Sequence, residues 1–203
     1  DRIVKKHLSA SDLYFHADLH GAPSCSLKLK DGFEIDEYPN PNIPEGVPSY
    51  KITQSLDNDD HSETVLKEAA QMAVCWSRAW ASGGSGATAF HAEKGQVSKT
   101  TESGESLGRG GFVVRGTRHW YKDIELNLTL GMIAINGIPL PLIGTHSVVS
   151  SICQRWVKLT PGNQKKEVVA TRISKATGLL QDDVLSALPP GTISIGEDLG
   201  IFS

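Results

Sequence analysis

An amphipathic helix pattern with strand patterns on either side is the feature that most constrains the fold. The segment HSETVLKEAAQMAVCWSRAWAS (61–82) repeats apolar residues at the 3–4 spacing of a helix. Ser62 can cap its first turn, and GGSG (83–86) ends the pattern. The predicted buried face consists of Val65, Leu66, Ala69, Met72, Ala73 and Trp76.

Short strand patterns surround this helix. DLYFHADLHGAPSCSLKLK (12–30) predicts two strands around a turn at 20–23, with Tyr14 and His16 on one face. Further strands are predicted in ATAFHA (87–92), in GFVVRG (111–116) and as a pair within 118–140 that turns at Asn136-Gly137. Because helices and strands alternate irregularly, we expect an α+β fold: a mixed β-sheet packed with helices, plus a small C-terminal α/β extension.

Two segments lie outside this central pattern. Residues 31–60 are rich in Pro, Asp and Asn, and we expect a long acidic loop or insertion, partly disordered, with one short strand near Tyr50–Ile52. We divide the chain into 1–141 and a C-terminal extension, 142–203. The sequence of the extension predicts a helix (145–156), a strand and turn (156–162), an amphipathic helix (163–178) and a last helical turn or two (181–191). In the amphipathic helix, Val168, Val169 and Ile173 are predicted to face inward.

The composition argues against a membrane-spanning chain and against a disulfide framework. No run of about 18 apolar residues occurs, which a transmembrane helix would require. Cys25, Cys75 and Cys153 are scattered and form no CxxC pair, so we predict three buried structural thiols and a reducing, cytoplasmic setting. The chain begins with Asp1 rather than Met, which suggests a fragment of a larger protein.

Charge is unevenly distributed along the chain, whose formal net charge is −3. Residues 31–60 hold eight Asp/Glu and one Lys, whereas residues 94–122 hold six Lys/Arg and two Glu. Such a local basic region on a neutral or acidic body suits an anionic polymer. We name its six cations the basic stripe: Lys94, Lys99, Arg109, Arg115, Arg118 and Lys122.

Aromatic side chains accompany the basic stripe. His119, Trp120 and Tyr121 lie near its end, and the preceding helix carries Trp76, Arg78 and Trp80. Lys and Arg can contact phosphates, and aromatic rings can stack on unpaired bases. The alternative is a solvated loop whose Trp residues belong to the core.

His16-x-Asp18-x-His20 is the sharpest metal-like pattern, because alternate strand residues share one face. Three interpretations stay open: metal ligands, the polar wall of a binding site, or residues that only shape the turn. No Gly-x-Ser-x-Gly, Walker A loop or strand–GxGxxG–helix unit occurs. We therefore predict no catalytic residue and no cofactor.

Three strings resemble the NFACT-R domain of the NFACT family of ribosome quality control proteins. They are DLYFHADLHGAPS (12–24), AAQMAVCWSRAW (69–80) and GQVSKTTESGESLGRGGFVVRG (95–116), in the family's order and spacing over roughly residues 1–136. The tail, with WVKLTPGNQKK (156–166) and ALPPG (187–191), is similar to the extension of archaeal and eukaryotic-type members. The chain departs from the family at Gly95, where a His is common.

This resemblance implies a non-enzymatic RNA-binding module of a factor that acts on stalled nascent chains. Its implied partners are RNA (tRNA and rRNA) and the large ribosomal subunit, without a membrane, and the oligomeric state stays unknown. We predict phosphate contacts from Lys99, Arg109, Arg115 and Lys122 and a polar wall of His16, Asp18 and His20. The remaining predicted nucleic-acid-binding residues are Arg78, Lys94, Gln96, Ser98, Thr100 and Arg118.

Two alternatives to RNA binding remain. One is a metal-dependent hydrolase that uses His16, Asp18 and His20. The other is a scaffold that docks on a ribosomal protein rather than on RNA.

Overall fold

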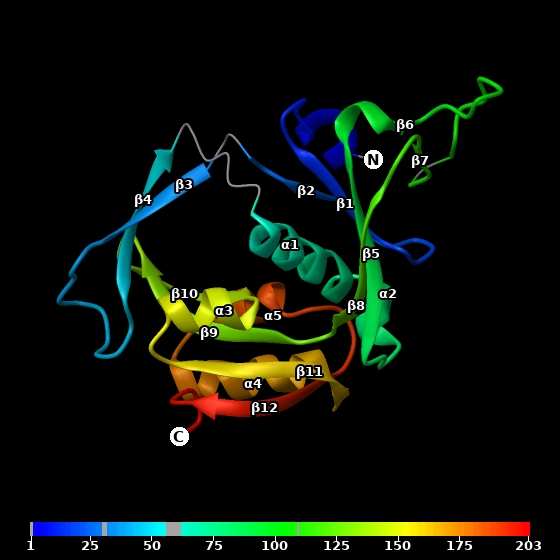
Figure 1. Cartoon of the computed structure of the whole chain (residues 1–203). Coiled ribbons are helices and arrows are strands. Elements are labelled where there is room, and N and C mark those ends of the chain that lie inside the picture. Colours follow the sequence, from blue (N-terminus) through cyan, green and yellow to red (C-terminus); the bar gives the residue numbers. More distant parts are fainter. Residues whose placement is uncertain (1, 30–31, 56–61, 109) are drawn as a thin grey trace. The chain divides into compact units, whose positions relative to one another are not determined.

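The computed structural model describes residues 2–29, 32–55, 62–108 and 110–203, which form two compact units (Figure 1). Unit 1 comprises residues 1–32, 55–79 and 86–125, and unit 2 comprises 33–54, 80–85 and 126–203. Both units combine helices with strands, and the sheets contain antiparallel and parallel pairs, so the α+β prediction is confirmed. No helix among the described residues is long and apolar enough to cross a membrane.

Unit 1 is built on a four-stranded antiparallel sheet in the order β2-β1-β5-β8. The strands are β1 (Leu13–Ala17), β2 (Cys25–Leu27), β5 (Gly86–Glu93) and β8 (His119–Glu125). The predicted turn between β1 and β2 is present, with Gly21 at a positive φ of 76° that favours glycine. A π-helix, η1 (Ile3–His7), precedes the sheet.

Helix α1 (Glu63–Cys75) packs against β1, β5 and β8. Ser62 caps it as predicted, because its Oγ accepts a hydrogen bond from the Val65 N–H at 3.3 Å. The predicted continuous helix over 61–82 is wrong. The Ser77 hydroxyl donates to the Val74 carbonyl at 2.7 Å and accepts from the Ala79 N–H at 3.1 Å, so it ends α1 and begins the short α2 (Arg78–Ala81).

The buried face of α1 also differs from the prediction. Ala70, Ala73, Val74 and Cys75 are buried, whereas only Ala73 belongs to the predicted set and the other five members are half-buried. Small residues therefore make the closest approach to the sheet, and the larger apolar residues lie at the edges of the contact. Trp76 is half-buried, and Trp80 is buried in unit 2 with its indole N–H donating to the Thr192 carbonyl at 3.1 Å.

The sheet face with Phe15, His91 and Tyr121 lies toward α1. The ring centroids of Phe15 and His91 are 5.3 Å apart, and His91 Nδ1 lies 2.7 Å from the Tyr121 hydroxyl. Burial, with help from the charge of His119, lowers the pKa of His91 to about 4. Burial and the charge of Glu63 at the start of α1 raise the pKa of Tyr121.

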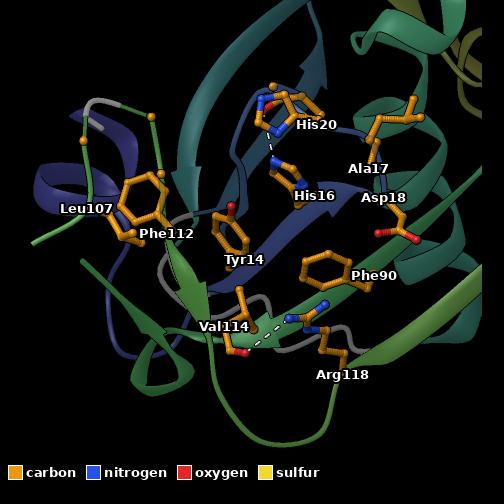
Figure 2. Close-up of a pocket in the computed structure, with 16 residues that line it drawn as sticks. Tyr14, His16, Ala17, Asp18, His20, Phe90, Leu107, Phe112, Val114 and Arg118 are labelled. Carbon is orange, nitrogen blue, oxygen red and sulfur yellow. Dashed lines mark hydrogen bonds between the residues drawn. The ribbon is translucent and has the colours of Figure 1, made fainter. Parts of the chain in front are cut away.

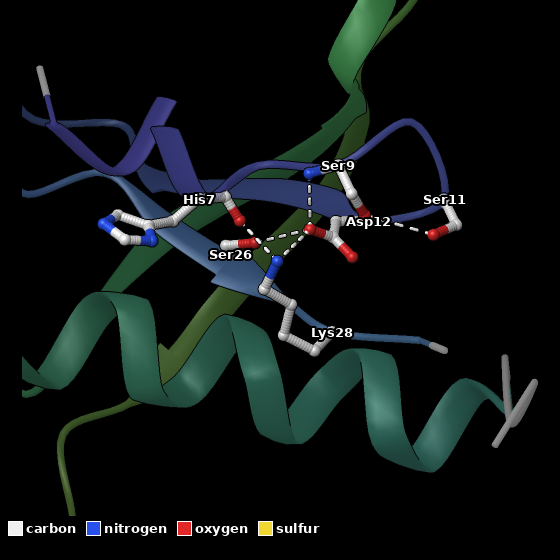
Figure 3. Close-up of polar contacts among 6 residues, drawn as sticks. All are labelled: His7, Ser9, Ser11, Asp12, Ser26 and Lys28. Atoms are coloured by element: carbon white, nitrogen blue, oxygen red, sulfur yellow. Dashed lines mark hydrogen bonds and ion pairs between the residues drawn. The ribbon is translucent and has the colours of Figure 1, made fainter. Parts of the chain in front are cut away.

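A buried carboxylate ties the N-terminal segment to the first two strands (Figure 3). Asp12 Oδ2 accepts hydrogen bonds from the Ser9 N–H and from Lys28 Nζ, each at 2.6 Å, and from the Ser26 hydroxyl at 3.4 Å. Lys28 Nζ also donates to the His7 carbonyl. Burial alone would raise the pKa of Asp12, but the hydrogen bonds from Lys28 and Ser9 outweigh it and leave the pKa below 3.8.

Unit 2 contains a six-stranded sheet whose centre is β9 (Leu128–Ile135). The strand order is β12-β11-β9-β4-β3, and β10 also pairs with β9. The remaining strands are β3 (Gly32–Glu37), β4 (Ser49–Ser55), β10 (Ile138–Gly144), β11 (Trp156–Gln164) and β12 (Ile193–Leu199). The predicted hairpin turn is confirmed: Asn136 and Gly137 both have positive φ, and Ile135 pairs with Ile138.

The acidic segment contains more structure than predicted. The expected strand near Tyr50–Ile52 is part of β4, which pairs in parallel with β9, whereas β3 was not predicted. Residues 34–37 of β3 are all exposed, with Ile35 at 42%, so backbone pairing rather than core packing holds this part of the strand. Residues 31 and 56–60 of the expected loop lie outside the described residues.

Helices α3 (His146–Ile152), α4 (Lys166–Thr177) and α5 (Gln181–Ala187) complete unit 2. Val169 and Ile173 face inward as predicted, but Val168 is 48% exposed and the prediction for it is wrong. Val168 lies about 100° around the helix from Val169, and Ala170 takes the buried position instead.

One further expectation, that all three thiols are buried, needs correction. Cys75 and Cys153 are buried thiols, but Cys25 is only half-buried, although burial raises the pKa of Cys25 to about 11. The predicted boundary at residue 141 falls inside β10, whereas the two compact units interleave along the chain, and the division into 1–141 and 142–203 stays a prediction. Strand β12 was also missed by the sequence patterns.

Candidate nucleic-acid interface

A cavity of about 650 Å³ opens in unit 1, on the sheet face opposite Phe15 and His91 (Figure 2). Two stretches far apart in the sequence meet there: the strand and turn with His16, Asp18 and His20, and the segment from Leu107 to Arg118. The lining residues come from β1, the turn at 18–22, β5 and the loop around β7 (Val113–Val114).

Contiguous rings form the floor of the cavity and continue onto β8. The ring centroids of His16 lie 6.0 Å from Tyr14 and 5.9 Å from Phe90. Phe90 in turn lies 5.2 Å from Trp120. Tyr14 and Phe90 are buried, whereas Trp120 is 45% exposed, so this row of rings reaches the surface at Trp120.

Arg118 lies over this aromatic floor. Its Cζ is 4.9 Å from the Phe90 ring centroid and 5.8 Å from that of Trp120, distances typical of cation–π contacts. One guanidinium nitrogen donates to the Val114 carbonyl at 3.3 Å. Arg118 is half-buried and lines the cavity, so part of its guanidinium plane faces the open space.

Lys99 holds the loop that forms the opposite wall. Its Nζ donates to the Gly108 carbonyl at 2.9 Å and lies 4.6 Å from the centroid of the Phe112 ring. Both Gly108 and Phe112 line the cavity, and Figure 2 shows Leu107 and Phe112 across from His16 and Tyr14. Lys99 therefore positions this wall, whereas the sequence predicts a phosphate contact for it.

Three other predicted contact residues also bond within the loop. The Gln96 side-chain amide donates to the carbonyls of Arg115 and Thr117, both at 2.7 Å, and its Oε1 accepts from the Glu93 N–H. The Ser98 hydroxyl accepts from the Thr100 N–H at 3.1 Å. A predicted role in RNA contact for these side chains remains a prediction, and their shown role is to fix the loop beside β6 (Val97–Ser98).

Arg115 combines a loop contact with exposure. One of its guanidinium nitrogens donates to the Thr100 carbonyl at 2.9 Å and to the Thr101 carbonyl at 3.3 Å, and the residue as a whole is exposed. Lys94 and Lys122 are exposed as well. The Arg78 guanidinium lies beside the β1–β2 turn, because a Cβ added at Gly21 would meet its Cζ at 3.7 Å. Arg109 lies outside the described residues.

The His/Asp pattern lines the cavity, but its members do not converge. His16 Nε2 lies 3.0 Å from the Ala22 carbonyl, and because that oxygen can only accept, this nitrogen carries the hydrogen. Asp18 and His20 are exposed. Within the described part of the chain, no three His, Cys, Asp or Glu side chains lie together in a way that could hold a metal ion.

Sequence reasoning missed the aromatic lining of the cavity. Tyr14 was placed on the same strand face as His16, which is the signal that could have identified it. Phe90 is the cross-strand partner of His16, and no single-strand pattern reveals that pairing. Phe112 was predicted as part of a strand, but it lies in the loop and contacts Lys99.

Comparisons with known proteins identify the family of this chain. The family model described as the NFACT protein RNA binding domain matches residues 1–116. The archaeal Rqc2 homolog aRqcH of Methanocaldococcus jannaschii is 34% identical over 196 residues, which cover 95% of this chain and 25% of that protein. Ribosome quality control complex subunit NEMF of Homo sapiens is 35% identical over 118 residues, which cover 58% of this chain and 8% of that protein.

The chain thus spans about a quarter of the archaeal relative and less than a tenth of the human one. A solved structure, that of the C-terminal part of the fibronectin/fibrinogen-binding protein from Streptococcus suis, aligns with a TM-score of 0.36 and 21% identity over 62% of this chain and 36% of that chain. Since the family model covers more than half of the sequence, this chain belongs to the NFACT protein RNA-binding domain family.

Proposed function

We propose that this chain is the RNA-binding module of a ribosome quality control factor and binds RNA at the cavity of unit 1. The observation that carries the proposal is the cavity itself, which brings the His/Asp strand, an aromatic floor and cations of the basic stripe to one surface. Its RNA is tRNA or large-subunit rRNA, and the site of action is the ribosome in the cytoplasm.

We assign the attraction for phosphates to exposed cations of unit 1. Lys94, Lys122 and Arg115 are exposed on unit 1, and Arg78 lies beside the turn that forms one wall. Such contacts position a nucleic acid without reading its sequence, and they release counterions from the phosphate backbone. Binding therefore falls as the salt concentration rises.

The names of the relatives support the cellular context. The human relative is named as a subunit of the ribosome quality control complex, and the archaeal relative is named as a homolog of Rqc2. The part of them that corresponds to this chain is a binding module, and we assign no catalytic residue to it. His16, Asp18 and His20 then form a polar wall rather than a metal centre.

The test is a titration of labelled tRNA and of a large-subunit rRNA hairpin with the whole chain at several salt concentrations. We expect log K to fall linearly with log salt, and the charge reversal of Lys94→Glu plus Lys122→Glu to lower affinity about tenfold or more and to reduce the slope by about 2. Both residues are exposed, and no side-chain hydrogen bond or ion pair of either is found among the described residues.

Lys165→Glu plus Lys175→Glu is the matched control, since it changes the charge equally at exposed positions of unit 2. Equal losses of affinity in both double variants would show that net charge alone governs binding. Unchanged binding to purified large subunits by the unit 1 variant would instead favour a scaffold that docks on ribosomal protein.

A further inference from the structure

The size of the cavity and the segments around it limit which part of an RNA can enter. Its volume of about 650 Å³ lies within the range of roughly 300–1,000 Å³ that small-molecule sites occupy. A sheet floor, the turn at 18–22 and residues 107–108 and 110–114 bound it on separate sides. A base-paired A-form helix is far wider than such a cavity, whereas a nucleotide that has left its helix is of suitable size.

We infer that the cavity receives an unpaired nucleotide of the bound RNA, with its base against the guanidinium of Arg118. This inference rests on the proposed RNA binding and specifies which RNA is preferred: loops, bulges or single-stranded ends rather than duplex. Guanidinium planes and aromatic rings are the surfaces on which proteins stack unpaired bases.

Two aromatic rings and a carbonyl hold the Arg118 side chain in position for stacking. Phe90 and Trp120 lie under its guanidinium at 4.9 and 5.8 Å, and the Val114 carbonyl restrains one nitrogen. The guanidinium plane is therefore held in place before a ligand arrives, and less side-chain entropy is lost on binding. A base on its cavity side would extend an existing stack on Phe90.

The chemistry of the turn at 18–22 favours a base over a phosphate. Asp18 lines the cavity with an exposed carboxylate, which accepts hydrogen bonds and repels a phosphate group. His20 lies in the same turn and can bond to a base edge. The nucleotide's phosphates then lie outside, where the exposed Lys and Arg side chains contact them.

The loop wall depends on Lys99, which is a positioning residue for this site. It fixes the Gly108 carbonyl and contacts the Phe112 ring, so its loss would release the wall that faces the His16 strand. Lys94, only five residues away, has the same charge and is exposed, and it does not line the cavity. The two lysines therefore form a matched pair: replacement of either removes one positive charge, but only that of Lys99 disturbs the cavity wall.

The experiment compares an RNA hairpin carrying 2-aminopurine in its unpaired loop with the same strand annealed to its full complement. We expect the whole chain to prefer the hairpin and to quench the fluorescence of its 2-aminopurine. Phe112→Ala removes part of the wall that confines the base against Arg118, and Lys99→Gln loosens that wall, so each should lower hairpin affinity about tenfold and abolish the quenching. Lys94→Gln lowers affinity for hairpin and duplex equally and leaves the quenching intact.

The outcomes separate this inference from the proposed function. No salt-dependent binding to either RNA would overturn both. Equal affinity for hairpin and duplex, or quenching that survives Phe112→Ala and Lys99→Gln, would overturn the unpaired-nucleotide site while RNA binding stands. Far-UV circular dichroism checks that both loop variants fold, and Lys99→Gln keeps the test valid if Phe112→Ala does not.

Discussion

The two units bury different kinds of side chain. In unit 1 the described buried residues include the ionisable Asp12 and His91, whereas the buried polar side chains described in unit 2 are the hydroxyls of Thr129 and Thr145. Strand β9 at the centre of unit 2 is buried from Leu128 to Ala134, on both of its faces. The stability of unit 1 therefore depends on protonation, and the stability of unit 2 depends on packing.

The difference matches what each sheet exposes. In unit 1, α1 packs toward the side with Phe15 and His91, and the other side leaves a cavity beside His16. Polar side chains on both faces of the unit 1 sheet therefore surround the cavity or pack beneath it. In unit 2, strands β11 and β12 approach so closely that a Cβ at Gly162 would overlap Ser194.

The largest expected effect is the pH dependence that His91 gives to unit 1. The ring of His91 packs against Phe15 and His119 and bonds to the Tyr121 hydroxyl, and its pKa is about 4 in the folded protein against an ordinary 6.5. Between these values the unfolded chain binds a proton that the folded protein does not. The free energy of unfolding therefore falls as pH drops from about 6.5 to 4, by roughly 3 kcal/mol for a shift of this size.

Urea unfolding at pH 7, 5.5 and 4, with amide hydrogen exchange followed on β5 and β9, measures this effect. Protection should decrease more on β5 than on β9 as the pH falls. His91→Phe should remove the slope between pH 6.5 and 4. An unchanged slope in that variant, or an equal loss of protection on both strands, would contradict the proposed difference between the units.

The second effect concerns the Lys28–Asp12 ion pair, in which the Lys28 side chain is 37% exposed and Asp12 is buried. Lys28→Met leaves the carboxylate with only the Ser9 and Ser26 bonds, and we expect a loss of about 2 kcal/mol at pH 7, less than for a fully buried pair because Lys28 is partly solvated. In the parent, the lowered pKa of Asp12 stabilises the fold above pH 3.8 and this contribution is lost as pH falls below it.

Removal of Lys28 takes away its hydrogen bond and its charge, both of which lower the pKa of Asp12, so protonation of Asp12 costs the variant less stability in acid than it costs the parent. The difference in unfolding free energy between Lys28→Met and the parent should therefore shrink from pH 7 to pH 4, which denaturant unfolding at both pH values can show. Lys67→Met is the control, because the Lys67–Glu63 pair lies on the surface of α1 and should change stability little at either pH. If Lys28→Met lost the same unfolding free energy at both pH values, the cause would be lost packing rather than lost charge.

The smallest expected loss of stability comes from a substitution that disturbs packing in unit 2. A Cβ at Gly131 would lie 2.5 Å from the Cys153 sulfur and 2.9 Å from Val149 Cγ1, so Gly131→Ala should destabilise the protein by about 1 to 2 kcal/mol through overpacking. The loss should be the same at pH 7 and pH 5.5. RNA affinity of the folded variant should equal that of the parent.

Gly196→Ala provides the matched comparison, since its Cβ would have no neighbour closer than 3.5 Å. We expect it to unfold at nearly the parent's urea concentration. If both alanine variants lost the same stability, the cause would be the altered backbone freedom of glycine rather than the contact with Cys153.

Local signals in the sequence predicted local structure well. Ser62 as a helix cap, Asn136-Gly137 as a hairpin turn and the turn after His20 depend only on neighbouring residues, and all three are present. Predictions of which side chains face the interior were less accurate. Val168 is exposed and α1 ends at Cys75, because tertiary packing and the Ser77 hydroxyl outweigh the average helical period.

The sequence by itself determined the candidate site's chemical inventory: a cluster of Lys and Arg among aromatic residues, and the His/Asp strand. Only the tertiary structure decided which of these act together. Cross-strand pairing sets Phe90 beside His16, and the loop folds so that Gln96 and Lys99 bond to carbonyls of their own segment while Arg118 lies on the aromatic floor. The physical reason is that hydrogen-bonding capacity and ring contact depend on distance in space, which spacing along the chain does not specify.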